Sequence, residues 1–122
     1  MTEQEIFDRV WQHFIVGGAP FSLNGRKCAY RGVGTHNGVR VRCAVGLFIS
    51  DDNYDPLFEG VGLGEHTDEL LGALEPGCED HENLLYELQQ AHDICALSRR
   101  GDVFRELLVD VAQDHGLQVP SD

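Results

Sequence analysis

The chain has few basic residues and no long apolar run. Only nine of its 122 residues are lysine or arginine, against 21 aspartates and glutamates, so the formal net charge is −12. This charge argues against direct binding to nucleic acid, which needs a positive surface. No apolar run approaches the roughly 18–20 residues of a membrane span, and the acidic start is unlike a signal peptide. We therefore expect a cytoplasmic protein without membrane contact, whose four cysteines are reduced thiols or metal ligands.

The sequence also lacks internal repeats, linkers and low-complexity segments. A hydrophobic fraction of 42% with 25% charged residues is that of a folded domain, and 122 residues suffice for one modest core. We expect a single domain over residues 1–122.

Four segments show the apolar spacing of helices. Thr2 and Glu5 form a capping-box signature at the start of a helix predicted over 2–16, which the glycines at 17 and 18 and Pro20 end. A short helix is predicted from 65 or 67 to 74, a longer one to 97 with Asp80 as its N-cap, and a last one over 103–115. The side chains expected in the core are Ile6, Phe7, Val10, Trp11 and Phe14, then Leu84, Leu85, Leu88, Ala91, His92 and Cys95, then Phe104, Leu107, Leu108, Val111 and Ala112.

Residues 26–50 predict a β-hairpin. Its turn lies either at Asn37 and Gly38, with Cys28 opposite Leu47, or nearer Thr35, with Cys28 opposite Cys43. Both registers place the same residues on each face. The inward face carries Cys28, Tyr30, Val39, Val41, Cys43, Val45 and Leu47; the outward face carries Lys27, Arg31, Arg40 and Arg42, with Ala29 and Ala44 between them.

A two-stranded sheet is marginal on its own. The helices must therefore cover the hairpin, or its edge must pair with another copy in a homo-oligomer. The order of the elements predicts an α+β fold, in which one antiparallel β-hairpin, or a small sheet, packs against three or four helices.

The outward arginines are the first candidate for a binding site. Guanidinium groups bind phosphates and carboxylates, so Arg31, Arg40 and Arg42, with Tyr54 just beyond, can hold an anionic ligand or an acidic partner surface. The alternative is that they pair with acids of the chain itself, such as Asp51, Asp52 and Glu59. Asp51 and Asp52 begin a turn-rich acidic loop over 50–56.

The cysteines and histidines offer a metal hypothesis. Cys78, His81, His92 and Cys95 have zinc-like spacing, but His81 and His92 lie about 16 Å apart along one helix and cannot share an ion. A zinc site of Cys28, Cys43, His92 and Cys95 is better formed. The competing interpretation, that these residues are core side chains, is favoured.

An enzymatic hypothesis takes Cys43 as nucleophile, His92 as its base and Asp93 as the residue that orients the base. Neighbouring residues of a helix point about 100° apart, so Asp93 is expected to be poorly placed for this role. A buried thiol is also a poor nucleophile.

Three motifs resemble those of a known family. They are Cys28-Ala-Tyr-Arg31-Gly, the run Arg42-Cys-Ala-Val-Gly-Leu-Phe-Ile-Ser-Asp-Asp-Asn-Tyr-Asp-Pro-Leu-Phe-Glu-Gly60, and Leu88-Gln-Gln-Ala-His-Asp93. Together they resemble a family of small uncharacterised bacteriophage and prophage proteins. The matching positions are Tyr30, Arg31, Cys43, Asp51, Asp52, Tyr54, Glu59, His92 and Asp93.

The resemblance implies a mobile-element setting, where small acidic proteins often inhibit host defences by occupying a DNA-binding surface or sequestering a signalling molecule. We therefore expect a non-enzymatic, phage-type counter-defence inhibitor without a cofactor, which binds a host protein or an anionic small molecule. The predicted contact residues are Tyr30, Arg31, Arg40, Arg42, Asp51, Asp52, Tyr54 and Glu59. The same charged cluster can equally be a structural lock, with Arg31 bound to Asp51 or Glu59. The alternative function is a small Cys/His hydrolase or zinc-dependent enzyme that uses Cys43, His92 and Asp93.

Overall fold

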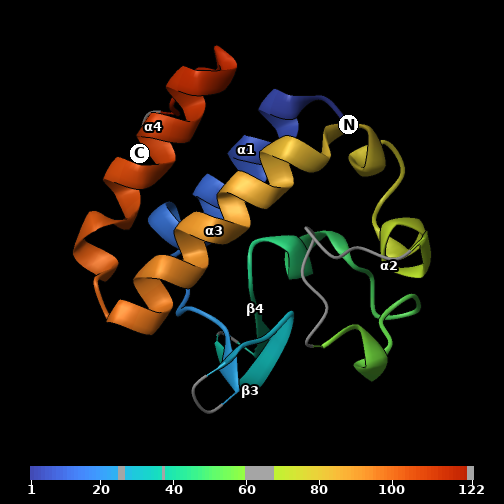
Figure 1. Cartoon of the computed structure of the whole chain (residues 1–122). Helices are drawn as coiled ribbons and strands as arrows, with labels where there is room; N and C mark the ends of the chain where they lie inside the picture. The colour runs from blue at the N-terminus through green and yellow to red at the C-terminus, as the bar shows by residue number, and fades with distance from the viewer. Residues whose placement is uncertain (25–26, 37, 60–67, 121–122) are drawn as a thin grey trace.

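The computed structural model describes residues 1–24, 27–36, 38–59 and 68–120, and of Asn24, Lys27, Cys28, Val33, His36 and Val39 the backbone alone. The order of its helices and strands is that of an α+β fold, which confirms the predicted class. Three longer helices, α1 (Glu3–Trp11), α3 (Glu82–Ser98) and α4 (Phe104–His115), pack together, and the strands lie on the other side of α3 from α4 (Figure 1).

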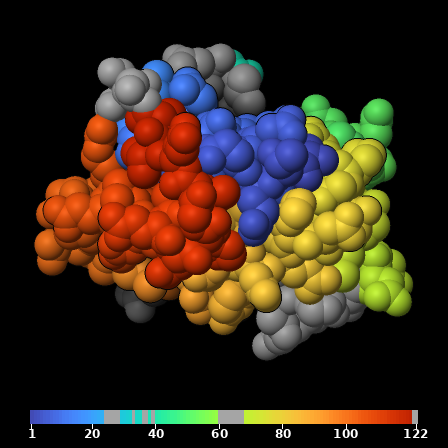
Figure 2. Space-filling model, turned by 90° about the horizontal axis from the view of Figure 1, so that it is seen from above, coloured from blue at the N-terminus to red at the C-terminus, as the bar shows by residue number. Residues whose placement is uncertain are grey.

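The first helix begins as predicted. The hydroxyl of Thr2 accepts a hydrogen bond from the backbone N–H of Glu5, and the Glu5 carboxylate accepts one from the Thr2 N–H, which confirms the capping box. After Trp11 the helix widens into a π-helical turn, η1 (Gln12–Val16), that ends at Gly17. All five apolar side chains predicted to face inward are buried. Figure 2 shows α1 between α4 and the N-terminal part of α3.

The strands form two short antiparallel hairpins. The first pairs β1 (Leu23–Asn24) with β2 (Lys27–Cys28), and the second pairs β3 (Arg31–His36) with β4 (Val39–Arg42). Because Cys28 pairs with Leu23, both partners predicted for it, Leu47 and Cys43, are wrong.

The register of the second hairpin combines the tight turn with an irregularity. His36 pairs with Val39, as the tighter of the two predicted turns requires. A bulge between Arg31 and Thr35 then shifts the pairing, so that Arg31 faces Arg42 at the other end of the hairpin. The bulge explains why no single register fits the whole hairpin.

The predicted second strand ends early. It stops at Arg42, and Val45–Phe48 form a 3-10 turn, η2, instead of continuing to Ser50. Residues 43–46 and 48–49 are all buried, and a short run that is apolar on every side does not distinguish a strand from a helical turn. Tyr30, Val41, Cys43 and Val45 are buried as predicted, but so are Ala29 and Ala44, which were expected on the outward face.

Two shorter elements connect the strands to the long helices. Helix α2 (Asp68–Ala73) lies within its predicted range, whose start at 65 or 67 falls outside the described residues. Its end is tied to the hairpin region by a bridge between Ile49 and Leu74. A 3-10 turn, η5 (Cys78–His81), then leads into α3, with His81 at the N-cap position, so the predicted Asp80 cap is wrong.

Two of the three long helices, α3 and α4, end in left-handed residues. Arg99 follows α3 with a φ of 57°, and Gly116 ends α4, as predicted, with a φ of 67°. A 3-10 turn, η6 (Gly101–Val103), joins the two helices.

One hydrophobic core joins the helices and the hairpin region. Every side chain of α3 predicted to face inward is buried, and of those in α4 only Leu107 is partly exposed. The rings of Phe14, Phe21, His92 and Phe104 form an aromatic cluster with centroids 5.0–6.0 Å apart. Within the described ranges, no helix has the length and apolar character to cross a lipid bilayer.

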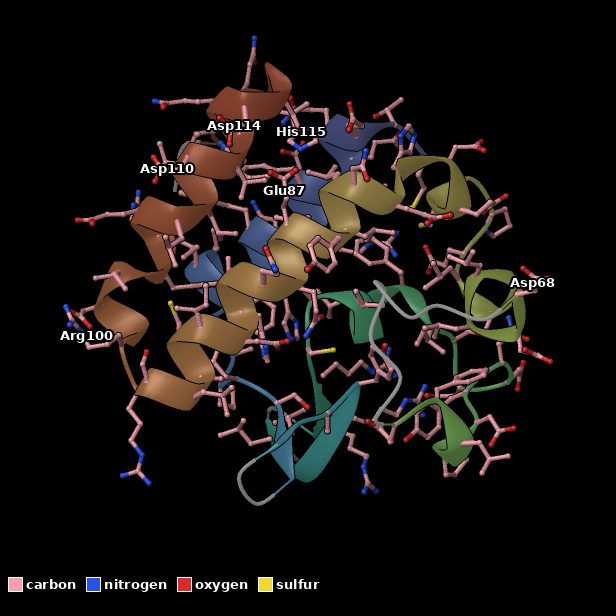
Figure 3. All side chains as sticks on the ribbon, in the orientation of Figure 1. Asp68, Glu87, Arg100, Asp110, Asp114 and His115 are labelled. Atoms are coloured by element: carbon pink, nitrogen blue, oxygen red, sulfur yellow. The ribbon has the colours of Figure 1, made fainter. Side chains whose placement is uncertain are left out.

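His115 connects the three long helices where the C-terminal end of α4 meets the start of α1 and the first half of α3. In α4, His115 contacts Glu3 of α1 through Nδ1, at 3.1 Å, and Glu87 of α3 through Nε2. Figure 3 shows Glu87 and His115 meeting between α3 and α4. Burial lowers the pKa of His115, but hydrogen bonds and charge from Glu87 and Glu3 outweigh it, so the pKa lies above its ordinary value.

Candidate functional site

The acidic segment over 51–59 is a loop whose first residue is held by two arginines. Arg31 and Arg42 face each other across the β3–β4 ladder, so both guanidinium groups reach the Asp51 carboxylate, at 2.6 and 3.0 Å. Arg31 also donates a hydrogen bond to the carbonyl of Ile49 at 3.3 Å. The Arg31 side chain is only 12% exposed, which makes it a structural anchor for the start of the loop.

The last residue of the loop binds the same part of β3. The Glu59 carboxylate accepts hydrogen bonds from the backbone N–H groups of Tyr30, at 2.9 Å, and Arg31, at 3.1 Å. Because Asp51 and Glu59 both bind Arg31, the two ends of the loop lie together, as in an Ω-loop. We call residues 51–59 the closed acidic loop.

Tyr54 braces the inside of the closed acidic loop. Its hydroxyl donates to Glu59 at 2.5 Å, and the Arg31 guanidinium stacks over its ring, 4.3 Å from the centroid. Burial raises the pKa of Tyr54 to about 12, with a further rise from the hydrogen bond and charge of Glu59, and Arg31 lowers it in part. The phenol is therefore protonated at neutral pH and serves as a donor.

The tip of the loop points into solvent with a defined shape. The Asp55 carboxylate caps a 3-10 turn, η3 (Pro56–Phe58, green in Figure 1), by accepting the N–H of Leu57 at 2.9 Å. Phe58 packs edge-on against Tyr54, with centroids 6.5 Å apart. This turn leaves Leu57 82% exposed, and the side chains of Asp52 and Asp55 in the same loop are exposed as well. The loop therefore presents an apolar side chain and negative charge to solvent together.

The structure separates the residues predicted to form a binding face. Arg31 and Arg42 are occupied by Asp51, Arg40 is exposed on β4, and the side chain of Lys27 lies outside the described residues. Tyr30 is buried in the core and contributes its backbone to the loop closure. Of the outward basic residues, Arg31 and Arg42 therefore pair with an acid of the chain itself, as the alternative interpretation of the sequence proposed.

Cys43 is a core residue. It is fully buried, its sulfur accepts a hydrogen bond from the backbone N–H of Gly46 at 3.3 Å, and burial raises the pKa of its thiol well above the ordinary value. A thiol in this environment stays protonated at neutral pH and is a poor nucleophile.

His92 uses both ring nitrogens inside the fold. Its Nε2 accepts the backbone N–H of Ser22 at 3.0 Å, so the proton is on Nδ1, which donates to the Asp93 carboxylate at 2.9 Å. The expectation that Asp93 is too far around the helix to orient His92 is wrong. Gln89, one turn earlier, donates to the same carboxylate oxygen at 2.6 Å and holds it near the imidazole.

These contacts leave the enzymatic hypothesis without a base. A general base for Cys43 needs a free ring nitrogen on His92, and both nitrogens are engaged. Gln89 instead connects the two regions, because its side-chain oxygen accepts the N–H of Val45, at 2.9 Å, while its nitrogen binds Asp93.

The zinc hypothesis has little support in the geometry. Among the residues that the structure describes, no three His, Cys, Asp or Glu side chains are grouped so that they could hold a metal ion. Cys43 and Cys95 are both buried, and the side chain of Cys28 lies outside the described residues.

Comparison with protein-family models, curated proteins and solved structures finds no match. The function is therefore argued from the geometry of the closed acidic loop. Two residues of this loop, Asp55 and Leu57, were not among the site residues predicted from the sequence, although they follow the predicted Asp51 and Asp52 closely in the chain. The signal for them is the Asp-Pro pair followed by an apolar residue, which marks a capped, exposed turn.

Proposed function

We propose that this chain is a non-enzymatic binding protein, of the bacteriophage or prophage setting that its motifs suggest, that inhibits a host defence protein by covering its cationic, nucleic-acid-binding surface. The observation that carries the proposal is the tip of the closed acidic loop, residues 52, 53 and 55–57, where Leu57 is 82% exposed and the carboxylates of Asp52 and Asp55 are also exposed. The tip is the contact surface, and the rest of the loop holds it in place.

The loop offers a basic surface both charge and an apolar anchor. Asp52 and Asp55 supply carboxylates where the partner would otherwise hold phosphates, and Leu57 enters an apolar pocket between the partner's cations. Burying one leucine side chain contributes roughly 2 kcal/mol. The formal net charge of −12 adds long-range attraction that speeds the encounter with a cationic partner.

Preorganisation supports binding by this loop. Its ends, Asp51 and Glu59, are both held by Arg31, and its turn is capped by Asp55, so little conformational freedom is lost when a partner binds. The competing role, capture of a small anion by the arginines, is less well supported, because both Arg31 and Arg42 are already paired with Asp51.

The first experiment measures inhibition directly. A panel of purified DNA-cleaving defence nucleases, both restriction enzymes and RNA-guided enzymes, is assayed for binding to a fluorescent DNA duplex in the presence of the protein. We expect the protein to compete with DNA for at least one nuclease, with inhibition that weakens as salt is added. A panel that binds DNA unchanged at every protein concentration would overturn the proposed inhibition.

Matched variants then locate the contact. Asp52→Asn/Asp55→Asn/Leu57→Ser should weaken inhibition by about tenfold or more. Glu106→Gln/Asp110→Asn removes the same number of charges from the exposed face of α4, and it should stay within about twofold of the wild type. If both variants lose inhibition equally, the effect comes from net charge and the loop is not the contact surface.

A further inference from the structure

Helix α3 exposes an apolar stripe that the proposed function does not use. Five of its exposed positions, at 83, 86, 90, 94 and 97, follow helical spacing and fall within an arc of about 80° at 3.6 residues per turn. Three of them carry large apolar side chains, with Tyr86 42%, Ile94 57% and Leu97 57% exposed. In Figure 1 α3 lies on the viewer's side of α1, which covers its opposite face.

Charge is distributed unevenly along this helix. At its N-terminal end the preceding turn exposes Glu79 and Asp80. At its C-terminal end Arg99 and Arg100 are exposed, and Arg100 pairs with Asp102 at 3.1 Å. Figure 3 shows Arg100 at the far end of α3 from the turn that precedes it. Two such helices repel in a parallel pair, where like ends meet, and attract in an antiparallel pair, where each acidic end meets a basic one.

The stripe is also nearly symmetric about its centre. Tyr86 and Ile94 lie equally far from Gln90, which is the middle residue of α3. An antiparallel arrangement with a two-fold axis at Gln90 therefore places Tyr86 of one copy against the apolar end of the other, near the partner's Ile94 and Leu97. The same axis brings the end of one α3 that is followed by Arg99 and Arg100 near the end of the other that is preceded by Glu79 and Asp80.

From this pattern we propose that the chain forms a two-fold symmetric homodimer through the exposed stripe of α3, with the two helices antiparallel and centred on Gln90. The occupant of the stripe is thus a second copy of the chain. Such an interface is self-complementary, as a two-fold interface must be. It does not involve the closed acidic loop, and it stands whether or not the proposed inhibition is correct.

Cross-linking tests the axis. Gln90→Cys should form a disulfide-linked dimer under mild oxidation, because helices packed 8–10 Å apart bring the residues on a two-fold axis within disulfide range. Tyr86→Cys should not, because the two copies of position 86 would lie about 12 Å apart along antiparallel helices. Cross-linking of both variants indicates a parallel pair, and cross-linking of neither indicates that the stripe does not pair; either result overturns the proposal.

Solution mass tests the contact without a cysteine. Analytical ultracentrifugation into the high micromolar range should show the mass rising from 13.6 kDa towards twice that value. Leu97→Glu should weaken dimerisation by about tenfold or more, while Leu57→Glu, the same change at a leucine that is 82% exposed outside the stripe, should leave it unchanged. A chain that is monomeric throughout, including one whose stripe binds a different protein, overturns the proposal.

A charge exchange provides the final test. Asp80→Arg and Arg100→Glu should each weaken the dimer, because each places like charges together at both ends. The Asp80→Arg/Arg100→Glu double variant should recover affinity, since each new charge then faces its opposite in the partner. If the double variant loses as much dimer affinity as the two single variants together, the antiparallel assignment is overturned.

Discussion

At the scale of single residues, Gly46 decides where β4 gives way to a turn. A Cβ atom at this position would lie 2.1 Å from the carbonyl oxygen of Tyr30. That oxygen also accepts the N–H of Cys43, so it has little freedom to move away. The backbone of the turn after β4 and the backbone before β3 therefore approach more closely than any side chain allows.

We expect Gly46→Ala to lower the free energy of unfolding by about 3 kcal/mol or more, because the clash is between backbone atoms. Urea denaturation followed by circular dichroism measures the change. Gly72→Ala is the matched control: it lies within α2, a Cβ there would meet nothing within 4 Å, and the helix should gain about 0.5–1 kcal/mol. Equal stabilities for the two variants would contradict the close approach.

The residue scale also shows where sequence reasoning succeeds. Tyr30, Val41, Cys43 and Val45 are buried as predicted, but alternation fails at Ala29, and it fails at Ala44 because the chain after Arg42 is a turn whose residues are largely buried. The bond between His92 and Asp93 was not predictable, since it depends on Gln89 bringing the Asp93 carboxylate to the imidazole. The average angle between neighbouring side chains on a helix does not show where a hydrogen bond from a third residue holds a carboxylate.

At the scale of elements, His115 joins three helices that are far apart in sequence. Below a pH of about 6.5 the imidazole is charged in the folded and the unfolded chain, and its contacts with Glu3 and Glu87 contribute fully to stability. Because the pKa is raised in the folded state, this contribution is lost as the pH rises from about 6.5 through the folded value.

We therefore expect the wild type to lose stability relative to His115→Gln as the pH rises from about 6 to 9, by about 1 kcal/mol or less. Thermal unfolding of both proteins at matched ionic strength measures the difference, and the other histidines titrate in both and cancel. Parallel stability curves over this range would mean that the imidazole is not paired as described.

The elements themselves were predictable to different degrees. The long helices follow from their apolar spacing, and the Thr2 cap and Gly116 mark the start of α1 and the end of α4 correctly, while the predicted cap of α3 was wrong. Strand lengths were overestimated because the ladder is interrupted by a bulge and by the turn at Val45–Phe48, and both depend on contacts with distant segments. In the acidic loop, the contacts of Arg31 with Asp51 and Glu59 were among the pairings considered from the sequence. The capped turn at the tip of the loop was not predicted.

At the scale of the whole molecule, like charge dominates. The formal net charge of −12 opposes compaction, and the described ion pairs, such as Arg9 with Glu75 at 2.6 Å, offset only part of this repulsion. We expect the melting temperature to rise by several degrees between low salt and about 0.3 M NaCl, as repulsion is screened. Differential scanning calorimetry measures the shift.

A variant with fewer charges is the control for this effect. Asp110→Asn/Asp114→Asn removes two carboxylates from α4, which Figure 3 shows along its outer side, and should respond less to salt than the wild type. A melting temperature that falls with added NaCl would mean that attractive pairs outweigh the overall repulsion.

The closure of the acidic loop on one arginine has a consequence for how this surface can change. The contacts that tie the loop to β3 lie at its two ends and at Tyr54, while positions 52, 53 and 55–57 are exposed and the contact that Asp55 makes there lies within the tip itself. Substitutions at the exposed tip therefore alter recognition without disturbing the core, whereas substitutions at the ends disturb both. The hairpin and its arginine thus act as a frame on which different tip sequences can be exchanged, whether by natural variation between related chains or by deliberate loop libraries.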